Sequence, residues 1–212
     1  MTDRRRWFAL AAIGLVAAMS AVAQPWNAGL SSYVAVSDPR HECLPWKAFW
    51  VKAPDPTKRL SVGDIVVVDP ALSGVRALSE VESNIIKMVL AGPGDHVLWT
   101  SQGLFVNGDR YAELAHPTLL EREQAQVLPA GRYVFVGVTE QSFDGRYFGS
   151  IDQSAVVGSA TPLFVRNWDS DYLDRYEEST SAALDFILSR RDRQLDGSDR
   201  GGRVRAVGTP SS

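Results

Sequence analysis

The sequence has a single cysteine, Cys43, and this scarcity excludes several classes of site. One cysteine cannot form an internal disulfide, and with three scattered histidines it shows no zinc-ligand spacing. The net charge of -3 leaves no excess of basic residues for binding nucleic acid. We therefore expect no metal ion, no cofactor and no nucleic-acid partner.

Charge is absent from an N-terminal run over residues 7–23, which is rich in alanine, leucine, valine and isoleucine. At ~1.5 Å per residue a helix of this run is about 25 Å long, at the short end of what spans a bilayer. The arginines at 4–6 favour a cytoplasmic N-terminus, so the rest of the chain is exported. Residues 21–23 also resemble a signal-peptide cleavage site, and that alternative exports the domain as well. We favour an uncleaved, single-pass anchor in the inner membrane with the following domain in the periplasm.

Short apolar runs separated by glycine, proline and asparagine turns fill the middle of the chain. The runs predicted as strands are 65–68, 84–91, 97–99, 104–106, 132–138, 156–157 and 160–165. Asn107 and Gly108 between two of them predict a tight hairpin turn. This pattern predicts a mainly β domain, coiled or barrel-like, followed by a helix over 169–191. The expected organisation is an anchor (1–24), a linker (25–40), the β domain (41–168), the helix and a disordered tail (192–212).

Lys87 lies in the middle of the apolar run 84–91, where a charged residue is unexpected. Burying an ammonium is costly, and a lysine kept neutral by its surroundings is a good general base. The alternative is an edge strand whose Lys87 points to solvent.

Two further segments carry residues capable of chemistry. In the segment 142–149, Asp144 and Arg146 lie two residues apart and could pair on one side of an extended chain, a side that Ser142 would share. The alternative is a solvated loop between strands. Cys43 is buried apolar filler, a surface thiol or a nucleophile, and it becomes a nucleophile as the thiolate when a nearby lysine accepts its proton.

In their order along the chain, these segments resemble the motifs of the signal peptidase I family. The segments that carry the resemblance are 61–68 (SVGDIVVV), 87–95 (KMVLAGPGD), 104–108 (LFVNG) and 142–149 (SFDGRYFG). The resemblance implies an all-β scaffold with a serine–lysine dyad, in which Lys87 is the general base. It also implies that Ser142, Asp144 and Arg146 support that lysine. Gly145 stands where the last motif usually has a serine.

The segment 42–49 (ECLPWKAF) resembles the nucleophile segment of the conjugative-transfer peptidases of the TraF and TrhF type, with Cys43 at the serine's position. Those relatives mature an exported pilin, and some join its new ends into a ring. The resemblance therefore implies a membrane-anchored pilin peptidase with a catalytic Cys43–Lys87 dyad. Two alternatives stay open: a general signal peptidase I that removes leader peptides, and a non-catalytic subunit that binds pilin during assembly.

Overall fold

The computed structural model describes residues 32–36, 43–120, 123–165 and 170–196. The chain divides into two units, Met1–Tyr33 and Val34–Ser212, and the description below concerns the second together with Ser32 and Tyr33, the described residues that precede it. The expected anchor, 1–24, lies outside the described residues, as does the tail from 197 onward. Within the described ranges, no helix is long and apolar enough to cross a membrane.

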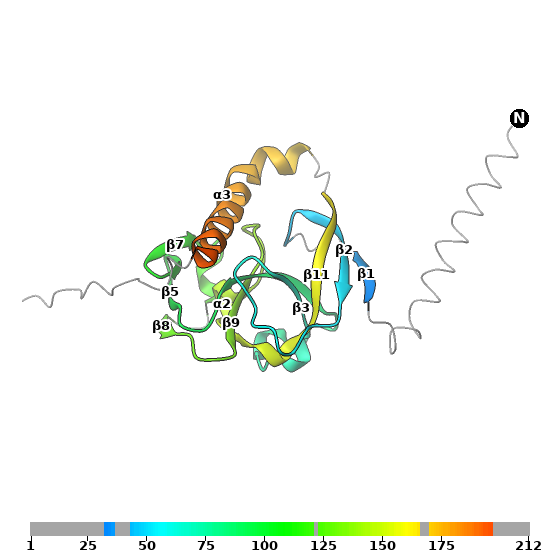
Figure 1. Cartoon of the computed structure of the whole chain (residues 1–212). Coiled ribbons are helices and arrows are strands. Elements are labelled where there is room, and N and C mark those ends of the chain that lie inside the picture. The colour runs from blue at the N-terminus through cyan, green and yellow to red at the C-terminus, as the bar shows by residue number, and fades with distance from the viewer. Residues whose placement is uncertain (1–31, 37–42, 121–122, 166–169, 197–212) are drawn as a thin grey trace, which may run out of the picture. The chain divides into compact units, whose positions relative to one another are not determined.

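The fold is mainly β, as the sequence predicts, and its strands form two sheets (Figure 1). The larger sheet has seven strands in the order β1-β2-β11-β3-β4-β9-β10. Their bounds are β1 Ser32–Val36, β2 Trp46–Lys52, β3 Ile65–Val68, β4 Ile85–Ala91, β9 Arg132–Val136, β10 Ile151–Asp152 and β11 Val156–Val165. Strand β1 thus lies within the segment expected to be a linker.

The inner strands of this sheet form because their residues are apolar and largely β-branched. All four residues of β3 (IVVV) are buried, and β4 is buried from Lys87 to Ala91. Strand β4 pairs with β3 on one side and with β9 on the other. Lys87 is therefore not on an edge strand, and its side chain is 2% exposed. The alternative in which Lys87 points to solvent is wrong.

The smaller sheet has four strands in the order β7-β6-β5-β8. Their bounds are β5 His96–Thr100, β6 Gly103–Val106, β7 Asp109–Ala112 and β8 Gln124–Val127. Asn107 (φ 54°) and Gly108 (φ 93°) join β6 to β7, and positive φ at both residues suits the predicted tight hairpin turn. Strands β7 and β8 were not predicted, because their sequences (DRYA and QAQV) carry too few apolar residues to show an alternation.

A long helix, α3, runs over Ser170–Leu195, beyond the end expected at 191. Its Ala183, Ile187 and Arg190 are buried, and their spacing places them on one face of the helix. Figure 1 shows α3 lying beside β7 of the smaller sheet. Arg190 donates a hydrogen bond to the Asp95 carboxylate over 3.0 Å, in the turn before β5.

The remaining helices are short. They are α2 at Gly145–Phe148 and the 3₁₀ turns η1 Pro70–Leu72, η2 Arg76–Leu78, η3 Pro117–Leu119 and η4 Gln153–Ala155. Phe148 of α2 packs into the main core cluster with Val89, Phe135 and Ile151 of the larger sheet. This packing fixes α2 against the face of that sheet.

Candidate active site

Cys43, Lys87 and Ser142 come from three separate parts of the sequence and meet at one point. The Lys87 Nζ atom lies 2.9 Å from Cys43 Sγ and 2.8 Å from Ser142 Oγ. The lysine and the serine are each 2% exposed, whereas the cysteine is partly exposed. The amine is therefore enclosed, and the residue that carries the thiol lies at the border of the buried region. These three residues are called the Cys43–Lys87–Ser142 cluster below.

Each member of the cluster is placed by a different element. Lys87 is held by β4, where its Cα lies opposite Val66 of β3. Cys43 precedes β2, and its backbone carbonyl accepts a hydrogen bond of 2.8 Å from the Val138 N–H. Ser142 lies in the segment 137–144 between β9 and α2, called the Ser142 loop below. Among the described carboxylates, none forms an ion pair with Lys87, so its amine is offered to the thiol and the hydroxyl.

Asp144 and Arg146 form a buried ion pair behind Ser142, as the sequence suggested. Arg146 donates from Nε to Oδ1 over 2.9 Å and from Nη2 to Oδ2 over 2.8 Å, with both side chains at most 2% exposed. The backbone is extended at Asp144 but turns into α2 at Gly145, and Asp144 caps this helix by accepting from the Arg146 N–H. Since both side chains are buried, the alternative of a solvated loop is wrong.

The electrostatics of this pair favour two charged groups. Burial alone raises the pKa of Asp144, but the Arg146 guanidinium and the hydrogen bonds to the carboxylate outweigh it and hold that pKa below its ordinary value of 3.8. Burial alone lowers the pKa of Arg146, and the attraction of Asp144 outweighs this and raises it above its ordinary value. Both groups of the pair are therefore charged at neutral pH.

Arg146 also holds the Ser142 loop directly. Its Nη2 donates to the backbone carbonyls of Thr139 over 2.7 Å and of Ser142 over 3.0 Å. A guanidinium has donors in a rigid planar fork, so one side chain can bind the carboxylate and the loop carbonyls together. Arg146 thereby fixes the backbone of the residue whose hydroxyl touches Lys87.

Sequence reasoning missed three residues around this loop. The Gly137 N–H donates to Asp144 Oδ2 over 2.7 Å, the Tyr111 hydroxyl donates to the Gly137 carbonyl over 3.0 Å, and the Trp99 indole N–H donates to the Gly145 carbonyl over 2.7 Å. Tyrosine and tryptophan usually find a hydrogen-bond partner when buried, and that tendency is the only signal the sequence offered.

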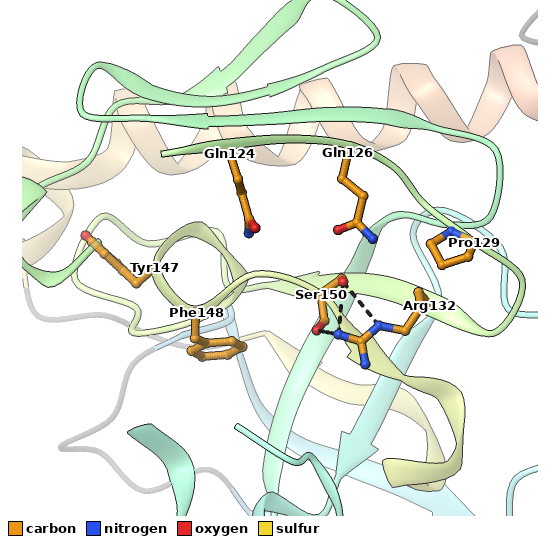
Figure 2. A pocket seen from close by; sticks show the side chains of 7 residues that line it. All are labelled: Gln124, Gln126, Pro129, Arg132, Tyr147, Phe148 and Ser150. Atoms are coloured by element: carbon orange, nitrogen blue, oxygen red, sulfur yellow. Dashed lines mark hydrogen bonds between the residues drawn. The ribbon is translucent and has the colours of Figure 1, made fainter. Parts of the chain in front are cut away.

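A separate cavity of about 400 Å³ lies between β8 and the segment that follows α2 (Figure 2). It is lined by Gln124, Gln126, Pro129, Arg132, Tyr147, Phe148 and Ser150. Figure 2 shows the Arg132 guanidinium bonded to Ser150 across one side of it. No member of the Cys43–Lys87–Ser142 cluster lines this cavity, so the two are different features of the molecule.

The chain matches a known protein family over the part that contains the segments 61–68, 87–95, 104–108 and 142–149. Residues 4–165 match the family model described as signal peptidase, peptidase S26, a match that includes all five predicted site residues and ends before α3. The plasmid transfer protein TraF of Escherichia coli is 32% identical over 92 residues, which cover 37% of this chain and 50% of that protein. The chain thus matches about half the length of this relative. A signal peptidase I structure from Enterococcus faecalis V583 is 22% identical, with a TM-score of 0.31, covering 50% of this chain and all of the other.

Proposed function

The chain belongs to the signal peptidase family, peptidase S26, and we propose that it is an endopeptidase that cleaves an exported pilin precursor with Cys43 as nucleophile and Lys87 as general base. The observation that carries this proposal is the contact of one buried amine with both a thiol and a hydroxyl, at 2.9 and 2.8 Å. A nucleophile and a base within hydrogen-bond reach, with a third group that orients the base, is the arrangement that nucleophilic catalysis requires.

In the proposed reaction, the neutral amine of Lys87 takes the proton of the Cys43 thiol. The thiolate attacks the scissile carbonyl, and the tetrahedral intermediate collapses as the ammonium of Lys87 returns the proton to the leaving amine. This forms a thioester between Cys43 and the new carboxyl end of the substrate. Lys87 then takes a proton from a water molecule that attacks the thioester, which releases the carboxylate and restores the thiol.

Ser142 orients the base in this scheme. A neutral amine has two N–H donors and one lone pair, so Lys87 can donate to Ser142 Oγ and direct its lone pair at the thiol of Cys43. Arg146 and Asp144 hold the loop in which Ser142 lies. Their role is to position Ser142, since neither contacts the thiol.

A pilin substrate is supported by the nucleophile segment and by the similarity to a plasmid transfer protein. Membrane association is supported by the family and by the uncharged run over residues 7–23. We infer from these that the protein is anchored in the inner membrane with its catalytic domain in the periplasm.

A thioester also allows a second outcome of the reaction, because the free amino end of the same substrate can replace water as the attacking group. That outcome forms a peptide bond and closes a ring.

The decisive test is the intact mass of the candidate pilin from cells carrying the wild type, Cys43→Ala or Cys43→Ser. We expect full-length precursor with Cys43→Ala, because no nucleophile remains. Lys58→Met, at an exposed lysine, serves as a control that should leave processing unchanged. A product one water lighter than the cut chain indicates ring closure. Normal maturation with Cys43→Ala contradicts the dyad and favours the pilin-binding subunit instead.

A general signal peptidase is the alternative enzyme within the same family. Complementation of a strain depleted of its housekeeping signal peptidase distinguishes the two enzymes. We expect no rescue of growth, since the segment around Cys43 is similar to the conjugative-transfer type.

A further inference from the structure

Gly137 packs closely against two members of the Cys43–Lys87–Ser142 cluster, and a larger residue at this position would collide with them. A Cβ atom at this position would lie 2.4 Å from Ser142 Oγ and 2.6 Å from the backbone carbonyl oxygen of Cys43. The backbone of Gly137 thus packs against the side chain of Ser142 and against the backbone carbonyl of Cys43. Any displacement of this peptide must move one or the other, so whatever holds Gly137 also sets the geometry of the cluster.

Both polar groups of Gly137 are bound by side chains. The N–H is bound by Asp144, and the carbonyl accepts from the hydroxyl of Tyr111 over 3.0 Å in a buried position. Tyr111 belongs to β7, in the smaller sheet, and is 6% exposed. Burial raises the pKa of Tyr111 above its ordinary value, so its hydroxyl keeps its proton and remains a donor.

The other end of the Ser142 loop is held from the same sheet. The indole N–H of Trp99, in β5, donates to the carbonyl of Gly145 over 2.7 Å, and Trp99 is 1% exposed. Gly145 follows the loop directly and is the first residue of α2. A Cβ on Gly145 would lie 2.8 Å from the carbonyl oxygen of Phe135 in β9, so this residue is also closely packed. The smaller sheet therefore binds both ends of the loop.

Helix α3 supports Tyr111 from its other side. The ring of Phe186 meets the ring of Tyr111 edge-on, with centroids 5.5 Å apart. The helix is fixed in place by the pair of Arg190 with Asp95 and by Gln194, whose side-chain oxygen accepts from the Val62 N–H. Since α3 begins after residue 165, this support lies outside the part of the chain that matches the family.

We propose that Tyr111 and Trp99 are positioning residues for the Cys43–Lys87 pair, and that α3 contributes to this role through Phe186. The inference rests on the proposed function, because it concerns the reactivity of Cys43. The hydroxyl of Tyr111 fixes Gly137, Gly137 fixes Ser142, and Ser142 orients the amine of Lys87. The smaller sheet and α3 thereby set the geometry in which Lys87 meets the thiol of Cys43.

The test uses the fact that Cys43 is the only cysteine, so alkylation by iodoacetamide, followed by intact mass, reports this thiol alone. The rate is measured from pH 5 to 10 on the purified full-length chain. We expect Tyr111→Phe to slow alkylation about tenfold near pH 7 and to move the pH profile upward, since about 1.4 kcal/mol corresponds to a factor of ten. Trp99→Phe should act in the same direction.

The matched control is Tyr147→Phe. Tyr147 is also buried, and its hydroxyl has no hydrogen-bond partner in the described part of the chain, so the same substitution there removes no bond. We expect its pH profile to coincide with that of the wild type. A general loosening of the protein would move both tyrosine variants alike, and equal shifts overturn the proposal.

Two further variants distinguish a failure of the proposed Cys43–Lys87 dyad from a failure of the positioning role of Tyr111. If Lys87→Met leaves the pH profile of alkylation unchanged, the dyad and the proposed function fail. If Lys87→Met shifts the profile while Tyr111→Phe does not, the dyad stands and the positioning role is wrong. Should Tyr111→Phe fail to fold, Phe186→Leu retains the hydroxyl and removes the edge contact. We expect about a threefold slower alkylation from it, and a wild-type profile overturns the proposal.

Discussion

The two sheets of this protein are stabilised in different ways. In the larger sheet the central strands β3, β4 and β9 are mostly buried, β3 along its whole length, and their position is set by burial of apolar area. The smaller sheet has polar, partly exposed strands such as β8, and it contacts the Ser142 loop through single hydrogen bonds from Trp99 and Tyr111. Apolar burial thus places the lysine, and directed polar contacts place the loop whose Ser142 it contacts.

The largest effect is expected from breaking the buried pair beside the larger sheet. Arg146→Met leaves the carboxylate of Asp144 buried without its partner, and we expect a loss of about 3–5 kcal/mol in the free energy of unfolding. The comparison is Arg110→Met in the smaller sheet, whose pair with Glu113 is exposed by 51% and 74%. That variant should cost at most ~0.5 kcal/mol. Urea unfolding measures the free energy of unfolding of both variants. Equal losses in Arg146→Met and Arg110→Met would mean that the buried pair contributes no more to stability than the exposed pair.

A smaller effect on stability, but a large one on activity, is expected from Gly137→Ala. The added Cβ must displace Ser142 Oγ or the Cys43 carbonyl, which should cost about 1–3 kcal/mol in stability and most of the cleavage rate. Gly108→Ala is the counterpart in the smaller sheet, where the added Cβ has open space and the cost comes only from the positive φ of 93°. The cleavage rate of each variant is measured on the pilin precursor. Activity retained in Gly137→Ala contradicts the close packing described for the cluster.

The smallest effect is expected in the acid range. The pKa of Asp144 is held below its ordinary value of 3.8 in the folded chain, so the unfolded chain binds the proton more readily. This contribution to stability is complete well above pH 4 and is lost as the pH falls through the lower, folded value. The free energy of unfolding should therefore decline below about pH 4, and less so in Asp144→Asn. Glu123→Gln removes a fully exposed carboxylate whose pKa is also lowered, by its hydrogen bonds with Ser101, and because solvent screens this site it should reduce the decline by less than Asp144→Asn does. If the free energy of unfolding declines equally below about pH 4 in the wild type and in Asp144→Asn, Asp144 is not the source of the decline.

Much of the larger sheet could be predicted from local pattern. Strands β3, β4 and β9 were expected at 65–68, 84–91 and 132–138, and the structure places them at Ile65–Val68, Ile85–Ala91 and Arg132–Val136. The third ends early because the N–H of Gly137 is taken by Asp144 instead of a neighbouring strand. Strand β11 is continuous although it contains Pro162, and an irregular register with β2 at that residue accommodates it.

In the candidate site, too, some residues could be predicted from the sequence and others could not. The order of the motifs along the chain predicts Cys43, Lys87 and Ser142 as site residues, whereas Tyr111, Trp99 and Gly137 belong to no such pattern. The first group stands out because a thiol and an amine are unusual residues in their segments. The second group consists of ordinary residues of a β domain, and only their partners distinguish them. Those partners lie up to 46 residues away, and no local pattern encodes such contacts.

The sequence by itself determined the chemical inventory of this protein: one thiol, the lysine within β4, and the continuous apolar runs that make β3 and β4. Only the tertiary structure decided that Lys87 meets Cys43 and Ser142, which lie 44 and 55 residues from it along the chain. Side-chain types and strand propensity are local properties of a sequence. The distance between two side chains depends instead on strand pairing and on the packing of the Ser142 loop against a second sheet.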